Sequence, residues 1–263
     1  MVMRRVYGRL GSVALLALAT AMASLPAGAV EVKLRADSWC PYNCEPGNRP
    51  GYLIEIVRAA LEPAGHKVDY QLMPWTDALA AVTAGTATGA VGATKEEAPG
   101  MIYPGLSLGM SRPTLVIRKG KETKDFKVTN LDALKAVRFG SIKDYFYSTE
   151  VNAFIDANKG SPNIVQVSGD NVTEDLVNLL IDGKIDAMVE DSNVVDFLLE
   201  SKGYRNLFNY HALGQQTSVS IGLSPKDPNS AAYAKLIDAK VAELRKNGQL
   251  TAILDKYGVK DWQ

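Results

Sequence analysis

Acidic and aromatic residues stand at the ends of several apolar segments, where they are able to hold a small charged molecule. Asp191 follows the alternating segment 185–190, and Trp39 and Tyr42 lie in a polar loop after residues 32–36. Aromatic rings stack on planar or cationic groups, and a carboxylate attracts a positive group. The sequence shows no nucleophile with a nearby base, no metal-ligand cluster and no phosphate-binding loop. These residues therefore predict ligand binding without a cofactor, and no enzymatic reaction.

Each of these residues also fits a purely structural role. Buried aromatic residues usually pack in a core, and an aspartate at the start of a helix usually caps it. The polar loop favours the binding role for Trp39 and Tyr42, whereas Trp75 begins an apolar helical stripe and fits either role. Asp191 fits a helix cap and a binding residue equally well.

A helix, a strand and a second helix are expected around Asp191. Apolar residues recur at helical spacing over 172–180, and Gly183 ends that helix. Residues 185–190 alternate as in a strand, and a second helical stripe runs over 194–199. Asp191 then lies at the carboxyl end of a strand, where open α/β sheets bind ligands.

Strand and helix patterns alternate along the rest of the chain, which implies α/β layers with largely parallel sheets. The polar segment 119–127 has no apolar stripe and is a candidate domain boundary. The other strands are expected at 32–36, 68–72, 89–93, 115–118, 137–142, 164–167 and 219–223, and the other helices near 53–61, 75–84, 151–154, 233–247 and 250–257.

The first 29 residues have the pattern of a secretory signal peptide. Three arginines precede an apolar run, and a small-residue cleavage site ends at Ala29. The run is too short to remain in a bilayer, so an exported protein is expected. Removal of this segment leaves 26 basic and 29 acidic residues, a net charge of −3. A negative charge argues against nucleic acid as a partner.

The sequence contains two cysteines, Cys40 and Cys44, separated by three residues. In an exported protein this spacing predicts a disulfide that closes a tight loop. The spacing is one residue longer than that of a thioredoxin-type redox motif. His66 and His211 are far apart in the sequence, so no metal site is expected.

Three short motifs follow one another in the exported part of the chain. They are GYLIEI at 51–56, PWTDAL at 74–79, and GKIDA at 183–187 with Asp191 after it. In this order and spacing they resemble the motifs of the polar amino-acid binding family, family 3, of the periplasmic solute-binding proteins of ABC importers. The resemblance covers essentially the whole chain after residue 29.

The resemblance implies an α/β, two-lobed periplasmic binding protein fold of type II. Each lobe would be a mostly parallel sheet flanked by helices, with lobe 1 at 30–118 and 221–263 and lobe 2 at 119–220. Two hinge strands, near 114–119 and 216–223, would let the lobes close over a ligand. The implied function is that of a monomeric periplasmic protein that captures a small polar, amine-containing solute and delivers it to an ABC permease in the inner membrane.

By the same resemblance, Trp39, Tyr42 and Trp75 occupy positions whose aromatic rings pack on the ligand, and Asp191 holds its amino group. In the second lobe three adjacent aromatic residues on a loop before a helix are unusual for packing alone, so Tyr145 or Tyr147 is expected in the cleft. The loop 143–148 occupies the place of the family's glycine-threonine loop, which binds a carboxylate. The candidate ligand-binding residues are Trp39, Tyr42, Trp75, Thr94, Lys95, Glu97, Tyr145, Tyr147 and Asp191.

The chain departs from the family after Thr94, where the family carries an arginine that pairs with the ligand's α-carboxylate. Here Glu97 stands in its place, and no arginine occurs between Thr94 and Arg112. A carboxylate at this point repels an ordinary amino acid unless Lys95 or Arg112 reaches into the site. Acidic and aromatic side chains suit an amine or another cation, although Glu97 fits a solvated surface charge equally well.

Two other functions stay open. The resemblance extends to periplasmic dehydratases of the same fold, in which Glu97 and Lys95 would form an acid–base pair. A ligand-sensing subunit of a membrane receptor would use the same cleft, and the sequence does not separate sensing from transport.

Overall fold

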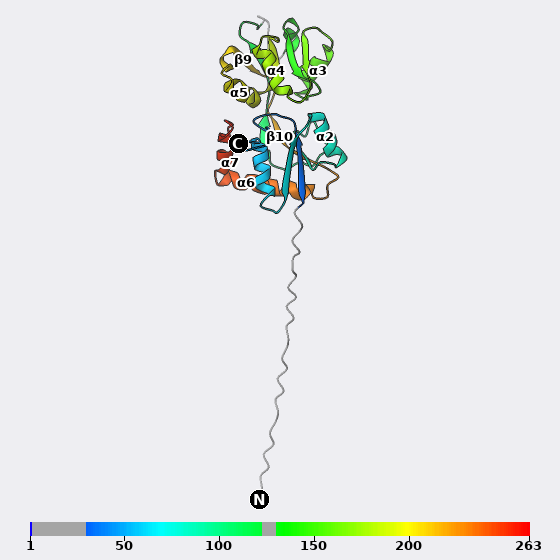
Figure 1. The fold of residues 1–263 in the computed structure, drawn as a ribbon, viewed down its shortest axis with the longest axis vertical. Coiled ribbons are helices and arrows are strands. Elements are labelled where there is room, and N and C mark those ends of the chain that lie inside the picture. The colour runs from blue at the N-terminus through cyan, green and yellow to red at the C-terminus, as the bar shows by residue number, and fades with distance from the viewer. Residues whose placement is uncertain (2–29, 123–129) are drawn as a thin grey trace.

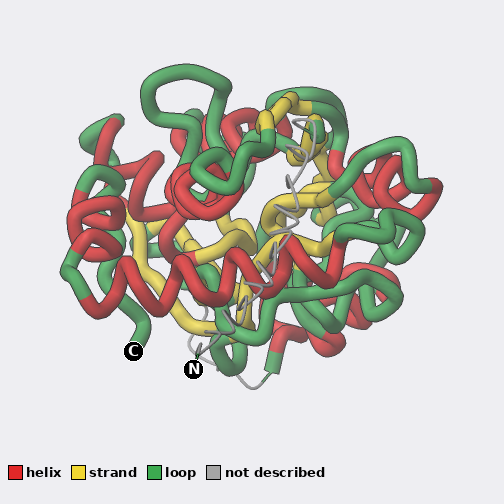
Figure 2. The backbone as a smooth tube through the Cα atoms, turned by 90° about the horizontal axis from the view of Figure 1, so that it is seen from below, coloured by secondary structure: helices red, strands yellow, loops and turns green. Residues whose placement is uncertain are grey.

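The computed structural model describes residues 1, 30–122 and 130–263. The expected signal peptide after Met1, and residues 123–127 of the expected domain boundary, lie outside the described residues. Within the described residues the strands form two five-stranded sheets, and helices lie around them (Figures 1 and 2). The two-sheet α/β fold predicted from the sequence is therefore confirmed.

The first sheet has the strand order β2-β1-β3-β10-β4. Its strands are β1 (Glu31–Ala36), β2 (Lys67–Leu72), β3 (Gly89–Ala93), β4 (Gly109–Ser111) and β10 (Thr217–Leu223). Its helices are α1 (Tyr52–Leu61), α2 (Trp75–Ala84), α6 (Ser230–Lys246) and α7 (Gln249–Asp255). They form the lower part of the coloured fold in Figure 1.

The second sheet has the strand order β7-β6-β8-β5-β9. Its strands are β5 (Pro113–Arg118), β6 (Phe139–Ile142), β7 (Ile164–Val167), β8 (Ala187–Asp191) and β9 (Phe208–Ala212). Its helices are α3 (Thr149–Ala157), α4 (Val172–Ile181) and α5 (Ser192–Ser201), with short 3-10 helices at Leu131–Ala136 and Arg205–Leu207. They form the upper part of the coloured fold in Figure 1.

Both sheets are mixed, whereas the sequence predicts mostly parallel sheets. Strands β2, β1 and β3 run parallel in one sheet, and β7, β6 and β8 run parallel in the other. In each sheet the two remaining pairings are antiparallel. Strands β5 and β10 arrive directly from the other sheet, without the helical crossover that parallel pairing of consecutive strands requires.

The chain changes sheets at two short connections. It leaves the first sheet at Arg112, between β4 and β5, and returns through residues 213–216, between β9 and β10. The strands at 113–118 and 217–223 were expected to cross between lobes, but each lies in a single sheet. The crossing points are therefore the short connections before these strands, and the exact lobe boundaries stay a prediction.

Apolar packing on both faces holds the first sheet in its layer. Helix α6 buries Ile237 and Val241, which lie four residues apart on one face, against β1 and α1. Helix α2 packs on the opposite face in a separate cluster with Ala90 of β3. A large-to-small change such as Ile237→Ala in such a core costs about 2–5 kcal/mol.

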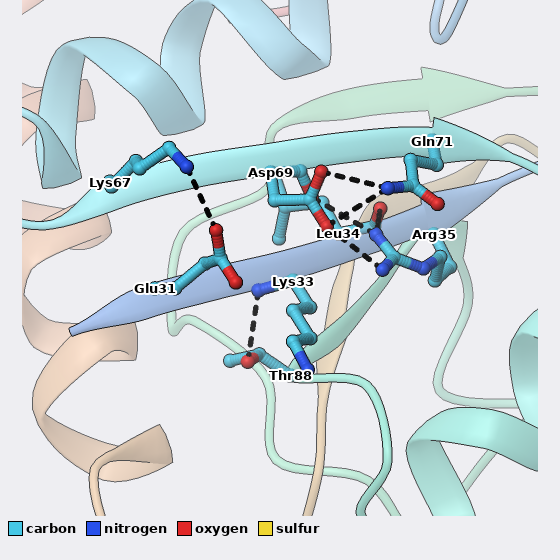
Figure 3. A network of polar contacts seen from close by, with 8 residues as sticks. All are labelled: Glu31, Lys33, Leu34, Arg35, Lys67, Asp69, Gln71 and Thr88. Carbon is cyan, nitrogen blue, oxygen red and sulfur yellow. Dashed lines mark hydrogen bonds and ion pairs between the residues drawn. The ribbon is translucent and has the colours of Figure 1, made fainter.

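A partly buried ion pair joins the edge strand β2 to β1 (Figure 3). Arg35 donates from Nη2 to Asp69 Oδ2 at 2.9 Å, and its Nη1 donates to the backbone oxygens of Leu34 and Asp69. The guanidinium is thus satisfied although Arg35 is buried. Charge-assisted bonds of this kind fix the register of β1, and β1 leads into the loop that carries Asp37 and Trp39.

Candidate ligand-binding site

A cavity of about 70 Å³ is lined by residues from both sheets. Two kinds of side chain dominate its wall. The aromatic residues are Trp39, Trp75, Tyr145, Phe146 and Tyr147, and the acidic residues are Asp37, Glu96, Glu97, Glu190 and Asp191. Of the residues that the structure describes along this wall, none is basic. The cavity is therefore both aromatic and strongly acidic.

Glu190, at the carboxyl end of β8, reaches across to the first sheet's loop. Its Oε1 accepts hydrogen bonds from Trp39 Nε1 at 2.8 Å and from the backbone N–H of Asp191 at 2.7 Å. Its Oε2 is buried and has no hydrogen-bond partner within the described residues. Burial raises the pKa of Glu190 to about 8, although the bond from Trp39 opposes the rise.

Asp37, the first residue after β1, is a second buried acid on the wall. It is 7% exposed, and its Oδ2 is buried without a partner among the described residues. The pKa of Asp37 is raised to about 7, mainly by burial and in smaller part by the charge of Glu97. Asp37 in turn raises the pKa of Glu190. The acidic groups are therefore close enough to oppose one another's ionisation.

Trp75 and Glu97 form a pair on the first sheet's side of the cavity. Trp75 begins α2 and donates from Nε1 to Glu97 Oε1 at 2.7 Å. The backbone N–H of Glu97 donates to Thr94 Oγ1 at 3.2 Å, which holds the turn that carries the acid. Burial raises the pKa of Glu97, so this acid is not the solvated surface charge that the sequence left open. All three residues line the cavity.

Asp191 caps helix α5. Its Oδ1 accepts from the backbone N–H groups of Asn193 at 2.8 Å and Val194 at 3.2 Å, and its Oδ2 accepts from that of Arg112 at 2.8 Å. Burial raises the pKa of Asp191, and these hydrogen bonds oppose the rise. Asp191 lines the cavity, but protein donors already occupy both of its oxygens. Asp191 therefore has the cap role, and its place on the cavity wall keeps the ligand-binding role a prediction.

Tyr42 lies behind the cavity wall and is fully buried. Its ring stacks on that of Trp39, with 4.2 Å between centroids and 16° between planes. Its hydroxyl lies 3.0 Å from Asp191 Oδ1 and accepts a hydrogen bond from Asn193 Nδ2 at 2.8 Å. Tyr42 is absent from the residues that line the cavity. It supports Trp39 from behind instead of facing a ligand.

The loop between β6 and α3 brings Tyr145, Phe146 and Tyr147 to the cavity. Asn152 fixes this loop, since its amide donates to Tyr145 O at 2.7 Å and accepts from Tyr147 N at 2.8 Å. Tyr147 Oη accepts from the backbone N–H of Ile142 at 2.7 Å. The hydroxyl of Tyr145 is buried and has no partner among the described residues. Of this loop, Tyr145 therefore offers a free hydroxyl to a ligand.

Lys95 does not reach this cavity. It is exposed and lines a separate hollow together with Tyr103 and Ser220. Arg112 is also absent from the cavity wall, although its backbone N–H binds Asp191. Neither side chain therefore replaces the missing arginine in this structure. Lys95 and Glu97 do not meet in the cavity as an acid–base pair.

The loop that carries Trp39 is closed by the expected disulfide between Cys40 and Cys44. Trp39 N donates to Asn43 O at 2.7 Å, which closes the same loop through the backbone. Opposite it, Gly92 has a φ of 101°, and a Cβ there would lie 3.0 Å from Asn43 Oδ1. Glycine is thus required at residue 92 for the loop to approach β3.

Four residues of the cavity wall are not among those expected from the sequence: Asp37, Glu96, Glu190 and Phe146. A signal existed for Asp37, because it directly follows the apolar alternation of β1, just as Asp191 follows β8. The same rule on the carboxyl ends of strands therefore applies to it. No comparable signal marked Glu190, which lies inside the expected strand.

The described residues form neither a metal site nor a membrane-spanning helix. No group of three or more His, Cys, Asp or Glu residues in this part of the chain is arranged to hold a metal ion. No helix in the same part is long and apolar enough to cross a bilayer.

Comparison with known proteins gives one family. The family model described as bacterial extracellular solute-binding proteins, family 3, matches residues 34–260. No curated protein sequence matches the chain.

Solved structures of the same fold are numerous. A histidine kinase sensor domain with similarity to periplasmic binding proteins has a TM-score of 0.69 at 16% identity, over 89% of this chain and 99% of that chain. An ABC uptake transporter substrate-binding protein from Streptococcus pneumoniae with bound histidine has a TM-score of 0.69 at 20% identity, over 88% and 93%. An ancestral amino acid-binding protein, a precursor of cyclohexadienyl dehydratase, has a TM-score of 0.62 at 16% identity, over 86% and 94%. At these identities the likeness extends to the fold alone.

Proposed function

The chain belongs to family 3 of the bacterial extracellular solute-binding proteins, and from this premise we propose that it is a periplasmic substrate-binding protein for a small polar, amine-containing solute. The solute binds in the cavity between the two sheets and is passed to an ABC permease of the inner membrane. The protein acts as a monomer and catalyses no reaction.

The observation that carries this proposal is the composition of the cavity wall. Aromatic side chains from both sheets surround a group of acids, and no basic residue lies among the described residues of the wall. Apolar faces with a few fixed polar groups are typical of small-molecule sites. A positively charged amine balances the acids, and the aromatic rings favour a cation.

The two connections between the sheets support a binding cycle with domain closure. The chain passes between sheets only at Arg112 and at residues 213–216 among its described residues, and a hinge needs few such connections. We propose one lobe on each sheet, with these connections as the hinge. Each lobe then supplies one half of the cavity wall.

Sensing is the second candidate, because a histidine kinase sensor domain is among the similar structures. It uses the same cavity and differs only in the partner that the closed protein contacts. The enzymatic alternative loses its support from Lys95 and Glu97, since Lys95 lies outside the cavity.

A ligand screen tests the proposal. Thermal unfolding of the purified exported chain is measured with α-amino acids, polyamines, quaternary amines and small organic acids, because a ligand of the folded state raises the melting temperature. At least one class of amine is expected to raise it in a dose-dependent way, with the compound recovered unchanged. Failure of all amines, or conversion of the bound compound, contradicts the proposal. Uptake of the ligand by cells with and without the gene then separates transport from sensing.

A further inference from the structure

We infer that the cavity selects a small organic cation that carries N–H donors and no carboxylate, and that Asp37 and Glu190 hold its positive group. This inference rests on the proposed function and narrows the ligand class. Asp191, the residue that the family resemblance assigned to this role, also lines the cavity, but protein donors already bind both of its oxygens.

Two unpartnered oxygens carry the inference. Oδ2 of Asp37 and Oε2 of Glu190 are buried and accept no hydrogen bond within the described residues, and both side chains line the cavity. Asp37 is 7% exposed and Glu190 2% exposed. A buried acceptor without a donor is unfavourable, so a ligand that brings N–H donors gains the bonds that the protein lacks. A quaternary ammonium has no such hydrogens.

The two acids come from opposite sides of the cavity. Asp37 follows β1 of the first sheet, and Glu190 ends β8 of the second. The pKa of Glu190 is raised mainly by burial and in smaller part by repulsion from the charges of Asp191 and Asp37. A cation between them relieves this repulsion and joins the two sheets. Cation binding therefore favours the closed arrangement directly.

Because no basic residue lies among the described residues of the cavity wall, we exclude a ligand that carries a carboxylate. The charged residues that the structure describes along the wall are all acidic, and Lys95 and Arg112 lie elsewhere. A ligand carboxylate placed near Glu97 meets a like charge and no positive partner. An amino acid therefore binds more weakly than the amine of the same skeleton.

The size of the cavity limits the ligand. A water-sized sphere needs about 10–15 Å³, and the cavity provides about 70 Å³. This is room for on the order of half a dozen atoms of that size. A short diamine with Glu97 near its second amino group fits both the volume and the acids, of which Asp37 and Glu190 are buried and Glu97 is partly buried.

Matched ligand pairs test the inference by isothermal titration calorimetry. The probes are 1,4-diaminobutane against ornithine, agmatine against arginine, and 1,4-diaminobutane against its fully N-methylated form. The first two pairs change only the carboxylate, and the third replaces the N–H donors with methyl groups, which also enlarges the ligand. In each pair the first compound is expected to bind at least about tenfold more tightly, the effect of one lost bond to a charged group.

Protein variants assign the site. Asp37→Asn and Glu190→Gln are each expected to weaken binding of the tighter amine about tenfold to a hundredfold. Glu45→Gln is the control, because it removes the same charge from an exposed residue outside the cavity wall. It is expected to change affinity less than threefold. Far-ultraviolet circular dichroism and melting temperature confirm that each variant is folded.

The outcomes separate the inference from the proposed function. Equal or tighter binding of ornithine or arginine overturns the inference but leaves an amine-binding transport protein. Equal binding of the methylated diamine overturns the assignment to N–H donors. Normal affinity in both Asp37→Asn and Glu190→Gln overturns the assignment to these residues. If no amine binds, the proposed function fails with it.

Discussion

Trp39 Nε1 donates a hydrogen bond to Glu190 Oε1 at 2.8 Å, and this bond links residues 151 positions apart in the sequence. Trp39 belongs to the loop after β1 of the first sheet, whereas Glu190 belongs to β8 of the second. The bond joins the two sheets across the cavity and leaves Glu190 Oε2 unpartnered. Closure and ligand binding are therefore linked through one carboxylate.

The change Trp39→Phe is expected to open the cavity. It keeps an aromatic ring to stack on Tyr42 but removes the donor to Glu190. The free energy of unfolding is expected to fall by about 1–2 kcal/mol, the value of one such hydrogen bond. Small-angle X-ray scattering of the unliganded protein is expected to give a larger radius of gyration than wild type.

Trp75→Phe is the matched control for this prediction. It also removes an indole donor to a glutamate, but Trp75 and Glu97 both lie on the first sheet's side of the cavity. Its radius of gyration is expected to stay at the wild-type value. An equal expansion in both variants contradicts the role of Trp39 as a link between the sheets.

Binding of a cationic ligand is expected to strengthen as the pH rises. Burial raises the pKa of Asp37 to about 7 and that of Glu190 to about 8. At pH 6 both acids are largely protonated and attract a cation poorly, whereas at pH 8 they are more ionised. Calorimetry with 1,4-diaminobutane is expected to show at least about a tenfold gain in affinity between these two pH values. No gain, or a loss, contradicts the prediction.

Stability without ligand is expected to change in the opposite direction. Between about pH 4.5 and 8 the folded protein retains a proton on Glu190 that the unfolded chain loses. The free energy of unfolding therefore falls with rising pH, by up to about 1.4 kcal/mol per pH unit for this group. Urea unfolding of Glu190→Gln is expected to show a shallower fall. An identical slope in variant and wild type contradicts the assignment.

The change Asp191→Ala is expected to destabilise the protein. Asp191 caps α5 and also accepts from the backbone N–H of Arg112 at the crossing between sheets. Loss of the cap and of this acceptor is expected to lower the free energy of unfolding by about 2–4 kcal/mol. Asp191→Asn keeps the cap acceptor but places an amide N–H₂ against the N–H of Arg112, so it is expected to lose about 1–2 kcal/mol, less than Asp191→Ala. Asp191→Ala with wild-type stability and no binding would return this residue to the role of ligand anchor.

The sequence located several residues of the cavity wall, because local hydrophobic patterns predict where strands end. Alternation over residues 185–190 located the end of β8 correctly, and Asp191 and Trp75 do line the cavity. The same alternation gave no role to Glu190, since all five residues of β8 are buried and the second sheet is covered on both faces. A strand that is buried on both faces has no solvent-facing polar side, so its pattern does not indicate which polar residue lines a cavity.

The parts of the site that could not be predicted depend on contacts between residues far apart in the sequence. The partner of Glu190 is Trp39, and Tyr42 lies behind Trp39 instead of beside it in the cavity. Both relations depend on how the loop 37–44 folds back on β3 and α5, which no local period encodes. The change of sheet at Arg112 depends likewise on strand pairing across the whole chain.

Tyr145 provides a test in which stability and binding change in opposite directions. Its hydroxyl is buried at the cavity without a partner among the described residues. In Tyr145→Phe the unliganded protein loses an unsatisfied polar group, so its free energy of unfolding is expected to rise by about 1 kcal/mol. Ligand affinity is expected to fall several-fold, because the hydroxyl no longer bonds to the ligand.

Tyr147→Phe is the control, since Tyr147 Oη already accepts from the backbone N–H of Ile142. That variant leaves a donor unpaired and is expected to lose about 1–2 kcal/mol. Urea unfolding and calorimetry on both variants measure the two effects, and a loss of stability in Tyr145→Phe contradicts the prediction.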